Sequence, residues 1–244
     1  ILTRKLSIFG QCASRCQPFV RAEMESVRDP DPARGLAKFD ELLFKHVGYA
    51  LSNAVRSFVM ALTLALFTEV PAIGVCRRFY QQINRFSASF ALAAGAAMLT
   101  MGGELKRKEL LSARLGDVLS YLYLASMVLK HYRDQGEPKD DLPLVEWSCR
   151  TLLYKTQEQL HGLLRNFPNR FVAALLRLAI FPRGRTYSAP SDALGQEITE
   201  LMINPTATRR RLADCAYTTV EPKNPLGLLQ EALERAEAGK PLGR

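Results

Sequence analysis

The sequence predicts an all-α fold in which helical bundles make up nearly the whole chain. Apolar residues recur at steps of three or four along most of its 244 residues, which is the period of a helix face. Pro and Gly interrupt these patterns where helices would end. No segment alternates regularly between polar and apolar residues, as a half-buried strand does. With 48% hydrophobic and 23% charged residues, the composition is that of a globular protein with a real core.

The first helical pattern covers residues 2–28 and is interrupted at Pro18. The motif Asp29-Pro30-Asp31-Pro32 stops it, because each Pro restricts itself and the residue before it. We place the first module boundary there. A second helix is expected over residues 35–66. Its apolar stripe contains Phe39, Leu42, Leu43, Val47 and Ala50.

A third helix is expected over residues 74–101. Residues 86–103 form an 18-residue run without charge, which reaches the length at which a membrane span becomes an alternative. We interpret the run as a buried bundle helix, because it is rich in Ala, Gly and Ser and therefore only weakly hydrophobic. Small side chains let neighbouring helices approach closely.

The clearest amphipathic helix follows Lys106-Arg107-Lys108 and ends at Gly136-Glu137-Pro138. Arg114 and Asp117 lie three residues apart on it, and such an ion pair contributes little by itself. Its apolar stripe consists of Leu111, Leu115, Val118, Leu119, Leu122, Ser126 and Leu129. The later elements are a helix over 143–164, a turn at 166–169, a very apolar helix over 171–181, helix starts at 191 and after 205, and a last helix over 226–238.

The charge is basic and unevenly distributed. Lys and Arg outnumber Asp and Glu by 33 to 24, for a net charge of +9. Residues 150–211 alone carry ten basic against four acidic groups. Such a region suits a phosphate-rich partner, and the alternative is a solvated basic face that aids solubility. We expect no nucleic-acid partner, because zinc-finger spacing is missing and the aromatic residues near the basic ones sit in apolar runs.

The five cysteines predict free thiols rather than a disulfide framework or a metal site. They are Cys12, Cys16, Cys76, Cys149 and Cys215. Their odd number and long spacings do not fit a framework, and a reducing cytoplasm is the expected compartment. Cys12 and Cys16 would share a helix face, but a structural zinc needs about four ligands, and no further His or Cys cluster supplies them.

Motifs of catalysis are missing from the sequence. There is no Gly-rich phosphate loop and no G-x-S-x-G elbow. His46, His131 and His161 are far apart and lack the spacing of metal ligands. The carboxylate pairs Asp40-Glu41 and Asp140-Asp141 are adjacent in sequence and therefore point to different helix faces. The residues alone predict a basic all-α module without a catalytic centre.

Six blocks of sequence, in order along nearly the whole chain, together resemble one known family. They are residues 1–11, 39–46, 111–126, 166–170, the motif Arg185-x-Tyr187-x-Ala189-Pro190-Ser191-Asp192, and residues 224–229. This chain resembles the C-terminal portion of a large bacterial-type, long-chain fatty acyl-CoA dehydrogenase. It includes the C-terminal extension that shorter acyl-CoA dehydrogenases lack.

The resemblance implies an FAD-dependent oxidoreductase of fatty-acid β-oxidation, which converts a fatty acyl-CoA into a 2,3-trans-enoyl-CoA. In this family a Glu abstracts the α-proton, while the β-hydrogen leaves as hydride to the flavin. That Glu lies in an E-G-x-x motif that would directly precede Ile1, so we expect no catalytic residue and no activity in this chain alone. Glu23, Glu25 and the other carboxylates match no catalytic position.

The resemblance also sets the expected domains and partners. Residues 1–28 would end the catalytic helical module, residues 33–205 would form the added helical extension, and residues 206–244 would form a tail with one helix. The implied partners are a fatty acyl-CoA substrate, an electron-transfer acceptor and further copies in a homo-oligomer. Ile1 and Thr3 would lie near the flavin, and the alternative is an ordinary helix N-terminus.

A second hypothesis is a membrane-surface or protein-partner-binding helical module without catalysis. The apolar helix over residues 171–181 would lie in an anionic interface, and the alternative is that this helix is simply core. Its flanking charges are Arg165, Arg170, Arg177, Arg183 and Arg185. The expected localisation is cytoplasmic, with peripheral contact at the inner membrane if this interface forms. The first residue is Ile and no secretory leader is visible, so we do not expect a secretory precursor.

Overall fold

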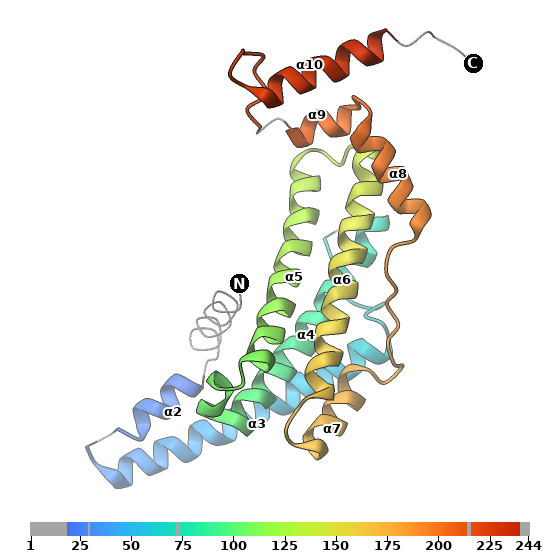
Figure 1. Ribbon diagram of the computed structural model, residues 1–244. Helices are drawn as coiled ribbons and strands as arrows, with labels where there is room; N and C mark the ends of the chain where they lie inside the picture. Colours follow the sequence, from blue (N-terminus) through green and yellow to red (C-terminus); the bar gives the residue numbers. More distant parts are fainter. Residues whose placement is uncertain (1–18, 29, 72–73, 214–215, 240–244) are drawn as a thin grey trace. The chain divides into compact units, whose positions relative to one another are not determined.

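The computed structural model describes residues 19–28, 30–71, 74–213 and 216–239, in which every regular element is a helix (Figure 1). The all-α prediction is therefore confirmed. The α-helices are α2 (Val20–Ser26), α3 (Pro32–Leu62), α4 (Val75–Met101), α5 (Glu109–Asp134), α6 (Leu142–Arg165), α7 (Arg170–Ile180), α8 (Asp192–Ile203), α9 (Ala207–Ala213) and α10 (Pro225–Ala238). Two 3-10 helices, η1 (Gly102–Lys106) and η2 (Lys139–Asp141), precede α5 and α6.

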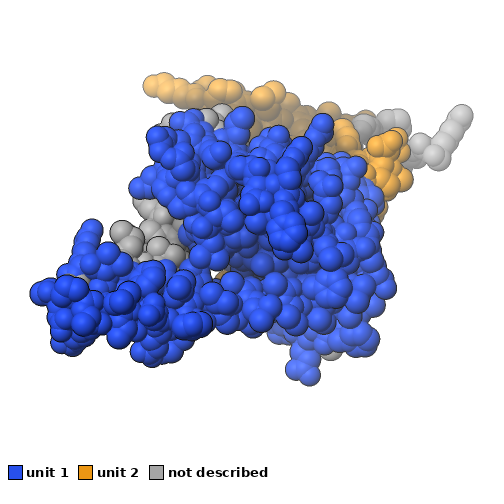
Figure 2. All heavy atoms as spheres, turned by 90° about the horizontal axis from the view of Figure 1, so that it is seen from below, with its two compact units in different colours: residues 1–129, 149–189 blue, residues 130–148, 190–244 orange. Residues whose placement is uncertain are grey.

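The chain divides into two compact units, which Figure 2 shows in different colours. Unit 1 contains residues 1–129 and 149–189, and unit 2 contains residues 130–148 and 190–244. Helices α5 and α6 therefore contribute to both units. The domain borders expected after residues 28 and 205 rest on the family resemblance and stay a prediction.

Helix α3 begins at the Asp-Pro break that the sequence indicated. Asp31 Oδ1 accepts hydrogen bonds from the backbone N–H groups of Ala33, at 3.0 Å, and Arg34, at 3.5 Å. Pro32 occupies the first helical position, where its missing N–H is tolerated. After the helix, Leu64 and Ala65 have φ values of 52° and 56°. Residues other than glycine rarely adopt this left-handed backbone conformation, so the turn from α3 to α4 is strained.

Helices α4, α5 and α6 supply most of the core of unit 1. Ala93 and Ala97 of α4 are fully buried, and α3 packs against α4 and α7. Ser57 Oγ of α3 lies 3.3 Å from Ser89 Oγ of α4. The stripe predicted on α5 is buried at Leu111, Leu115, Val118, Leu122 and Leu129, and half-buried at Leu119 and Ser126.

The segment Val75–Lys106 is, by length and composition alone, able to cross a membrane. Of its most apolar window, 39% is buried inside the protein. Core helices of soluble proteins pass the same test, so this is weak evidence for a span. The interpretation of this helix as part of a buried bundle stays a prediction.

The two described cysteines, Cys76 and Cys149, are buried in unit 1, and Cys149 is a free thiol. Burial, together with a smaller effect of Cys76, raises the pKa of Cys149 to about 12. Cys149 is therefore protonated at neutral pH and a poor nucleophile. Cys12, Cys16 and Cys215 lie outside the described residues.

Candidate functional site

A group of buried polar side chains lies in the middle of α4. Gln81, Gln82, Arg85 and Ser89 are each at most 3% exposed. Their spacing of three to four residues places them on one side of the helix. Arg85, at 1% exposure, is the largest fully buried side chain among the described residues. Arg is almost never buried so completely unless it is paired, so this cluster is the candidate site of unit 1.

Three residues of α4 hold the strained turn between α3 and α4. Arg78 Nη1 donates to the carbonyl oxygen of Leu64 at 2.8 Å, and Gln82 Nε2 donates to the same oxygen at 3.0 Å. Gln81 Nε2 donates to the carbonyl oxygens of Leu66, at 3.0 Å, and Thr68, at 3.3 Å. The turn with two positive φ values is thus fixed by Arg78 and by two side chains of the buried cluster, Gln81 and Gln82. Strain of this kind persists only where the surroundings determine it.

Arg85 uses only one of its three nitrogens. Its Nη1 donates to Gln82 Oε1 at 3.2 Å and to Thr186 Oγ1 at 3.0 Å. Its guanidinium carbon lies 5.0 Å from the ring centre of Phe86. Nε and Nη2 are buried and have no hydrogen-bond partner among the described residues. These two N–H groups point in parallel from one edge of the guanidinium, and such an edge binds a carboxylate or phosphate through two bonds.

Segment 182–189, which follows α7, is tied to this cluster. Gln157 of α6 holds the backbone of Tyr187 at two points: Tyr187 N–H donates to Gln157 Oε1 at 2.9 Å, and Gln157 Nε2 donates to the Tyr187 carbonyl at 2.8 Å. The Tyr187 ring meets the Phe86 ring edge to face, with 6.3 Å between their centres. The segment therefore brings Thr186 to Arg85, and it carries the Arg185-x-Tyr187 motif.

The electrostatic surroundings of Arg85 are unfavourable for its charge. Burial, together with the positive charge of Arg78, lowers the pKa of Arg85 to about 10. Burial is also the main reason why the pKa of Arg78 is lowered. At neutral pH Arg85 remains protonated, so the cluster holds a buried positive charge.

In unit 2 a second arginine uses the same edge on a carboxylate. Arg211 of α9 donates from Nε to Oδ2 of Asp141 at 3.0 Å and from Nη2 to Oδ1, and Thr208 Oγ1 donates to Oδ1 at 2.6 Å. Asp141 is 7% exposed. Burial by itself would raise the pKa of Asp141, but the hydrogen bonds from Arg211 and Thr208 and the charges of Arg211 and His131 outweigh it and lower the pKa.

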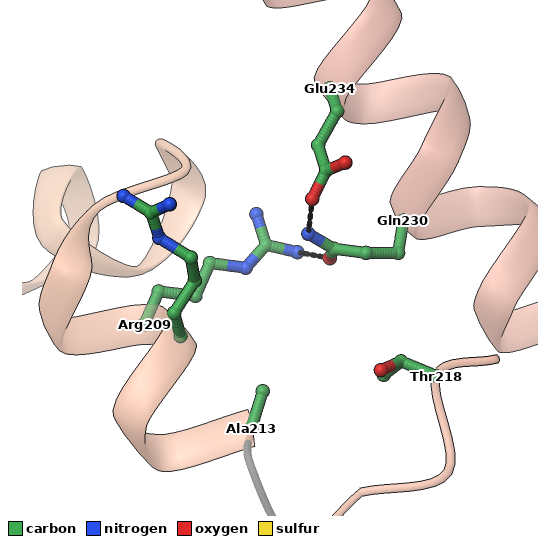
Figure 3. A pocket seen from close by; sticks show the side chains of 6 residues that line it. Arg209, Ala213, Thr218, Gln230 and Glu234 are labelled. Atoms are coloured by element: carbon green, nitrogen blue, oxygen red, sulfur yellow. Dashed lines mark hydrogen bonds between the residues drawn. The ribbon is translucent and has the colours of Figure 1, made fainter.

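Unit 2 also contains a pocket of ≈ 270 Å³ between α9, α10 and the segment that joins them (Figure 3). Arg209 Nη2 donates to Gln230 Oε1 at 2.9 Å, and Gln230 Nε2 donates to Glu234 Oε1 at 2.9 Å. The pocket is lined by Arg209, Arg210, Ala213, Thr218, Gln230 and Glu234. Its one carboxylate is thus already part of a hydrogen-bonded chain.

The structure places the basic residues singled out in the sequence on the surface of unit 1. Arg170 and Arg177 of α7 are exposed, as are Arg183 and Arg185 in the segment after it. Arg170 Nη1 donates to the carbonyl of Arg165 at 3.0 Å. Arg185 forms an ion pair with Glu158 at 3.1 Å. Ile1 and Thr3 lie outside the described residues.

Helix α7 has one buried side and one exposed apolar side. The first fits a core helix and the second fits a helix at an interface, the two alternatives that the sequence left open. Ala173, Leu176 and Ile180 are buried, so one side of the helix belongs to the core. The opposite side exposes three large apolar side chains, Phe171, Leu175 and Leu178, by 72%, 52% and 61%.

Sequence reasoning missed Arg85. One signal was available: a single Arg at the start of an 18-residue uncharged run, with Gln81 and Gln82 one turn before it. Polar residues at this spacing, on the same side of an otherwise apolar helix, indicate a buried polar contact.

Comparison with known families agrees with the six sequence blocks. Residues 14–244 match the family model for acyl-CoA dehydrogenase, C-terminal, bacterial type. No solved structure matches the chain. The family match covers nearly the whole sequence and every described helix, and the chain therefore belongs to the bacterial-type acyl-CoA dehydrogenase C-terminal family.

Proposed function

We propose that this chain serves an FAD-dependent acyl-CoA dehydrogenase of fatty-acid β-oxidation as its structural and docking extension. Membership in the C-terminal family supports the acyl-CoA dehydrogenase role. The fatty acyl-CoA, the electron acceptor and the catalytic Glu belong in this proposal to the enzyme's catalytic module. The enzyme is cytoplasmic and homo-oligomeric.

FAD does not fit the pocket that unit 2 offers. At ≈ 270 Å³, this pocket is smaller than the roughly 300–1,000 Å³ of typical small-molecule sites, and it cannot enclose a dinucleotide. We therefore assign the flavin to the catalytic module and derive no flavin step from these residues.

The docking role rests on one observation: α3 exposes a long apolar stripe. Leu51 is 65% exposed, Val47 56% and Val55 55%. At 1.5 Å per residue, the stripe runs for about 39 Å along the helix. It consists of Leu36, Leu43, Phe44, Val47, Leu51, Val55, Phe58 and Leu62. A soluble monomer rarely exposes so long an apolar surface, and such surfaces mark interaction sites.

The contact between α2 and α3 favours the catalytic module as the occupant of this stripe. Helix α2 lies in residues 1–28, which the proposal assigns to that module. His46 Nδ1 of α3 lies 2.8 Å from Glu23 Oε1 of α2, and His46 is 2% exposed. The Phe19 ring stacks on the His46 ring at 5.4 Å. Helix α3 thus already packs against a helix of the proposed neighbour.

The docking role is tested by comparing the whole dehydrogenase with the 244-residue chain. Val47→Asp together with Leu51→Asp places two charges on the stripe. We expect this pair to lower the Tm of the whole enzyme and to leave the Tm of the 244-residue chain nearly unchanged, where both positions are already exposed. Ser52→Asp adds a charge beside the stripe and should change neither. An unchanged Tm of the whole enzyme would contradict docking at this stripe.

Catalysis is tested on the purified 244-residue chain with FAD, palmitoyl-CoA and an artificial electron acceptor. We expect neither stoichiometric flavin binding nor dehydrogenation. Turnover by this chain would contradict a purely structural role.

The exposed side of α7 supports a second candidate function, peripheral contact with an anionic membrane surface. Phe171, Leu175 and Leu178 would enter the interface, and the nearby Arg170 and Arg177 would face the lipid head groups. Co-sedimentation with vesicles tests this: we expect more binding to anionic than to neutral vesicles, and less after Phe171→Ser with Leu178→Ser. Equal binding to both vesicle types, or binding to neither, would contradict it.

A further inference from the structure

We propose that Arg85 anchors a binding site for an oxyanion, a carboxylate or a phosphate group, which it holds on its Nε–Nη2 edge beneath segment 182–189. The site lies inside unit 1 and does not depend on the docking stripe or on the membrane contact of α7.

The hydrogen bonds of Arg85 orient this edge. Nη1 is fixed by Gln82 Oε1 at 3.2 Å and by Thr186 Oγ1 at 3.0 Å. Gln82 is itself anchored to the Leu64 carbonyl at 3.0 Å. Because Nη1 is held on one side, the planar guanidinium presents Nε and Nη2 in a fixed direction. Both are buried without a hydrogen-bond partner among the described residues, and a buried charged donor left unsatisfied is strongly unfavourable.

Arg85 has no acidic hydrogen-bond partner among the described residues. Of the residues outside the description, 1–18 and 72–73 contain neither Asp nor Glu, whereas positions 29 and 214 are Asp. Among the described residues, the Nε–Nη2 edge therefore has no hydrogen-bonded anion.

The pair in unit 2 shows what this protein places on such an edge. Arg211 binds the carboxylate of Asp141 through Nε and Nη2, and Thr208 adds a hydroxyl donor to the same oxygen. Arg85 also contacts a Thr hydroxyl, that of Thr186, but through Nη1, at 3.0 Å. A carboxylate and a phosphate can each offer two oxygens to the two parallel donors of a guanidinium edge. They are therefore the ligand chemistry we assign to Arg85.

Segment 182–189 is the route by which the anion enters. It has no regular secondary structure, and the hydrogen bonds from Arg85 and Gln157 hold it at Thr186 and Tyr187. Exposed segments with few contacts open locally at low free energy. Arg183 and Arg185 are exposed on this segment, and their positive charge raises the local concentration of anions.

Thermal denaturation of the 244-residue chain in sodium phosphate or sodium acetate tests the site, at an ionic strength kept constant with sodium chloride. Binding to the folded state raises the Tm in a saturable way. We expect such a rise with at least one of the two anions. A response to phosphate alone identifies a phosphate ligand, and a response to acetate alone identifies a carboxylate. If neither anion raises the Tm, the proposal is overturned.

Variants separate binding at Arg85 from the general stabilisation that phosphate gives to many proteins. Arg85→Met should abolish the saturable rise, and Arg77→Met, an exposed arginine of the same helix, should retain it. If Arg85→Met does not fold, Arg85→Lys serves instead. It keeps a cation but has no two-donor edge, so the anion concentration for half the effect should rise at least about tenfold. A response of either Arg85 variant equal to that of the unchanged chain would overturn the proposal.

Discussion

Arg85 in unit 1 and Arg211 in unit 2 present the same chemical group in opposite situations. Arg211 has both donors of its Nε–Nη2 edge on Asp141. Arg85 is more deeply buried, at 1% exposure against 31% for the Arg211 side chain, yet the same edge has no partner among the described residues. A pair within the chain stabilises its unit, whereas an unpartnered buried cation makes its unit dependent on a ligand. The difference indicates a structural role for Arg211 and a binding role for Arg85.

The largest effect is expected from removing the carboxylate of the paired arginine. Asp141→Leu leaves Arg211 and the Thr208 hydroxyl without their acceptor. We expect the free energy of unfolding to fall by about 2 kcal/mol, which is less than the 3–5 kcal/mol typical of a fully buried pair, because Arg211 is partly exposed. Chemical denaturation of the 244-residue chain measures this. A loss below about 0.5 kcal/mol would mean that the pair contributes no more than a surface ion pair.

Removing Arg85, whose Nε–Nη2 edge has no hydrogen-bond partner among the described residues, should raise the stability of the chain instead of lowering it. Arg85→Met keeps much of the side-chain volume and removes a buried charge that lacks a counter-ion. In a buffer without phosphate or carboxylate, we expect the free energy of unfolding to rise by about 1 kcal/mol. The same denaturation experiment measures it. A loss of stability of similar size would show that Arg85 is a structural residue like Arg211.

The geometry of the paired edge is tested by Arg211→Lys. Lys keeps the positive charge beside Asp141 but cannot form the two parallel hydrogen bonds. We expect a loss of stability that is smaller than that of Asp141→Leu. If Arg211→Lys lowers the free energy of unfolding as much as Asp141→Leu does, a positive charge beside Asp141 contributes nothing by itself. Only the two parallel hydrogen bonds would then matter.

The smallest effect on stability is expected from mild acid. It acts on the pair of Asp141 and Arg211 and not on Arg85. The pKa of Asp141 lies below its usual value of 3.8 in the folded protein. Its contribution to stability is therefore complete above the unfolded-state pKa and is lost as pH falls through the lower, folded-state pKa. The stability difference between the unchanged chain and Asp141→Asn should be constant from pH 7 to about 5 and should shrink below pH 4. A difference that already shrinks above pH 5 would contradict the lowered pKa.

Much of the fold could be predicted from the sequence because its signals are local. The Asp31-Pro32 pair begins α3, and Gly136 with its positive φ of 79° follows α5. The buried residues of the α5 stripe are apolar and recur at the helical period, so the helix can be recognised in the sequence. The assignment of residues 130–148 to unit 2 was not predictable. It includes contacts of Asp141 with Thr208 and Arg211, which are 67 and 70 residues away.

The candidate site was harder to predict than the helices. The sequence points to the basic residues that flank an apolar helix, Arg170, Arg177, Arg183 and Arg185, and their role in binding stays a prediction. Arg85 stands alone in the sequence, and a lone Arg is ordinarily a surface residue. Its burial depends on how α4 packs with α3 and α7 and on the position of segment 182–189. The pattern of one helix contains no information on either.

The most direct test of the account is the ¹⁵N NMR signal of the Arg85 Nε–H group during an anion titration of the 244-residue chain. Arg85→Lys assigns this signal by its disappearance. We predict that it shifts saturably with phosphate or acetate, while the Nε–H signal of Arg211, already bonded to Asp141, stays in place. An Arg85 signal that does not move with either anion, or that moves only together with the Arg211 signal, would contradict the account.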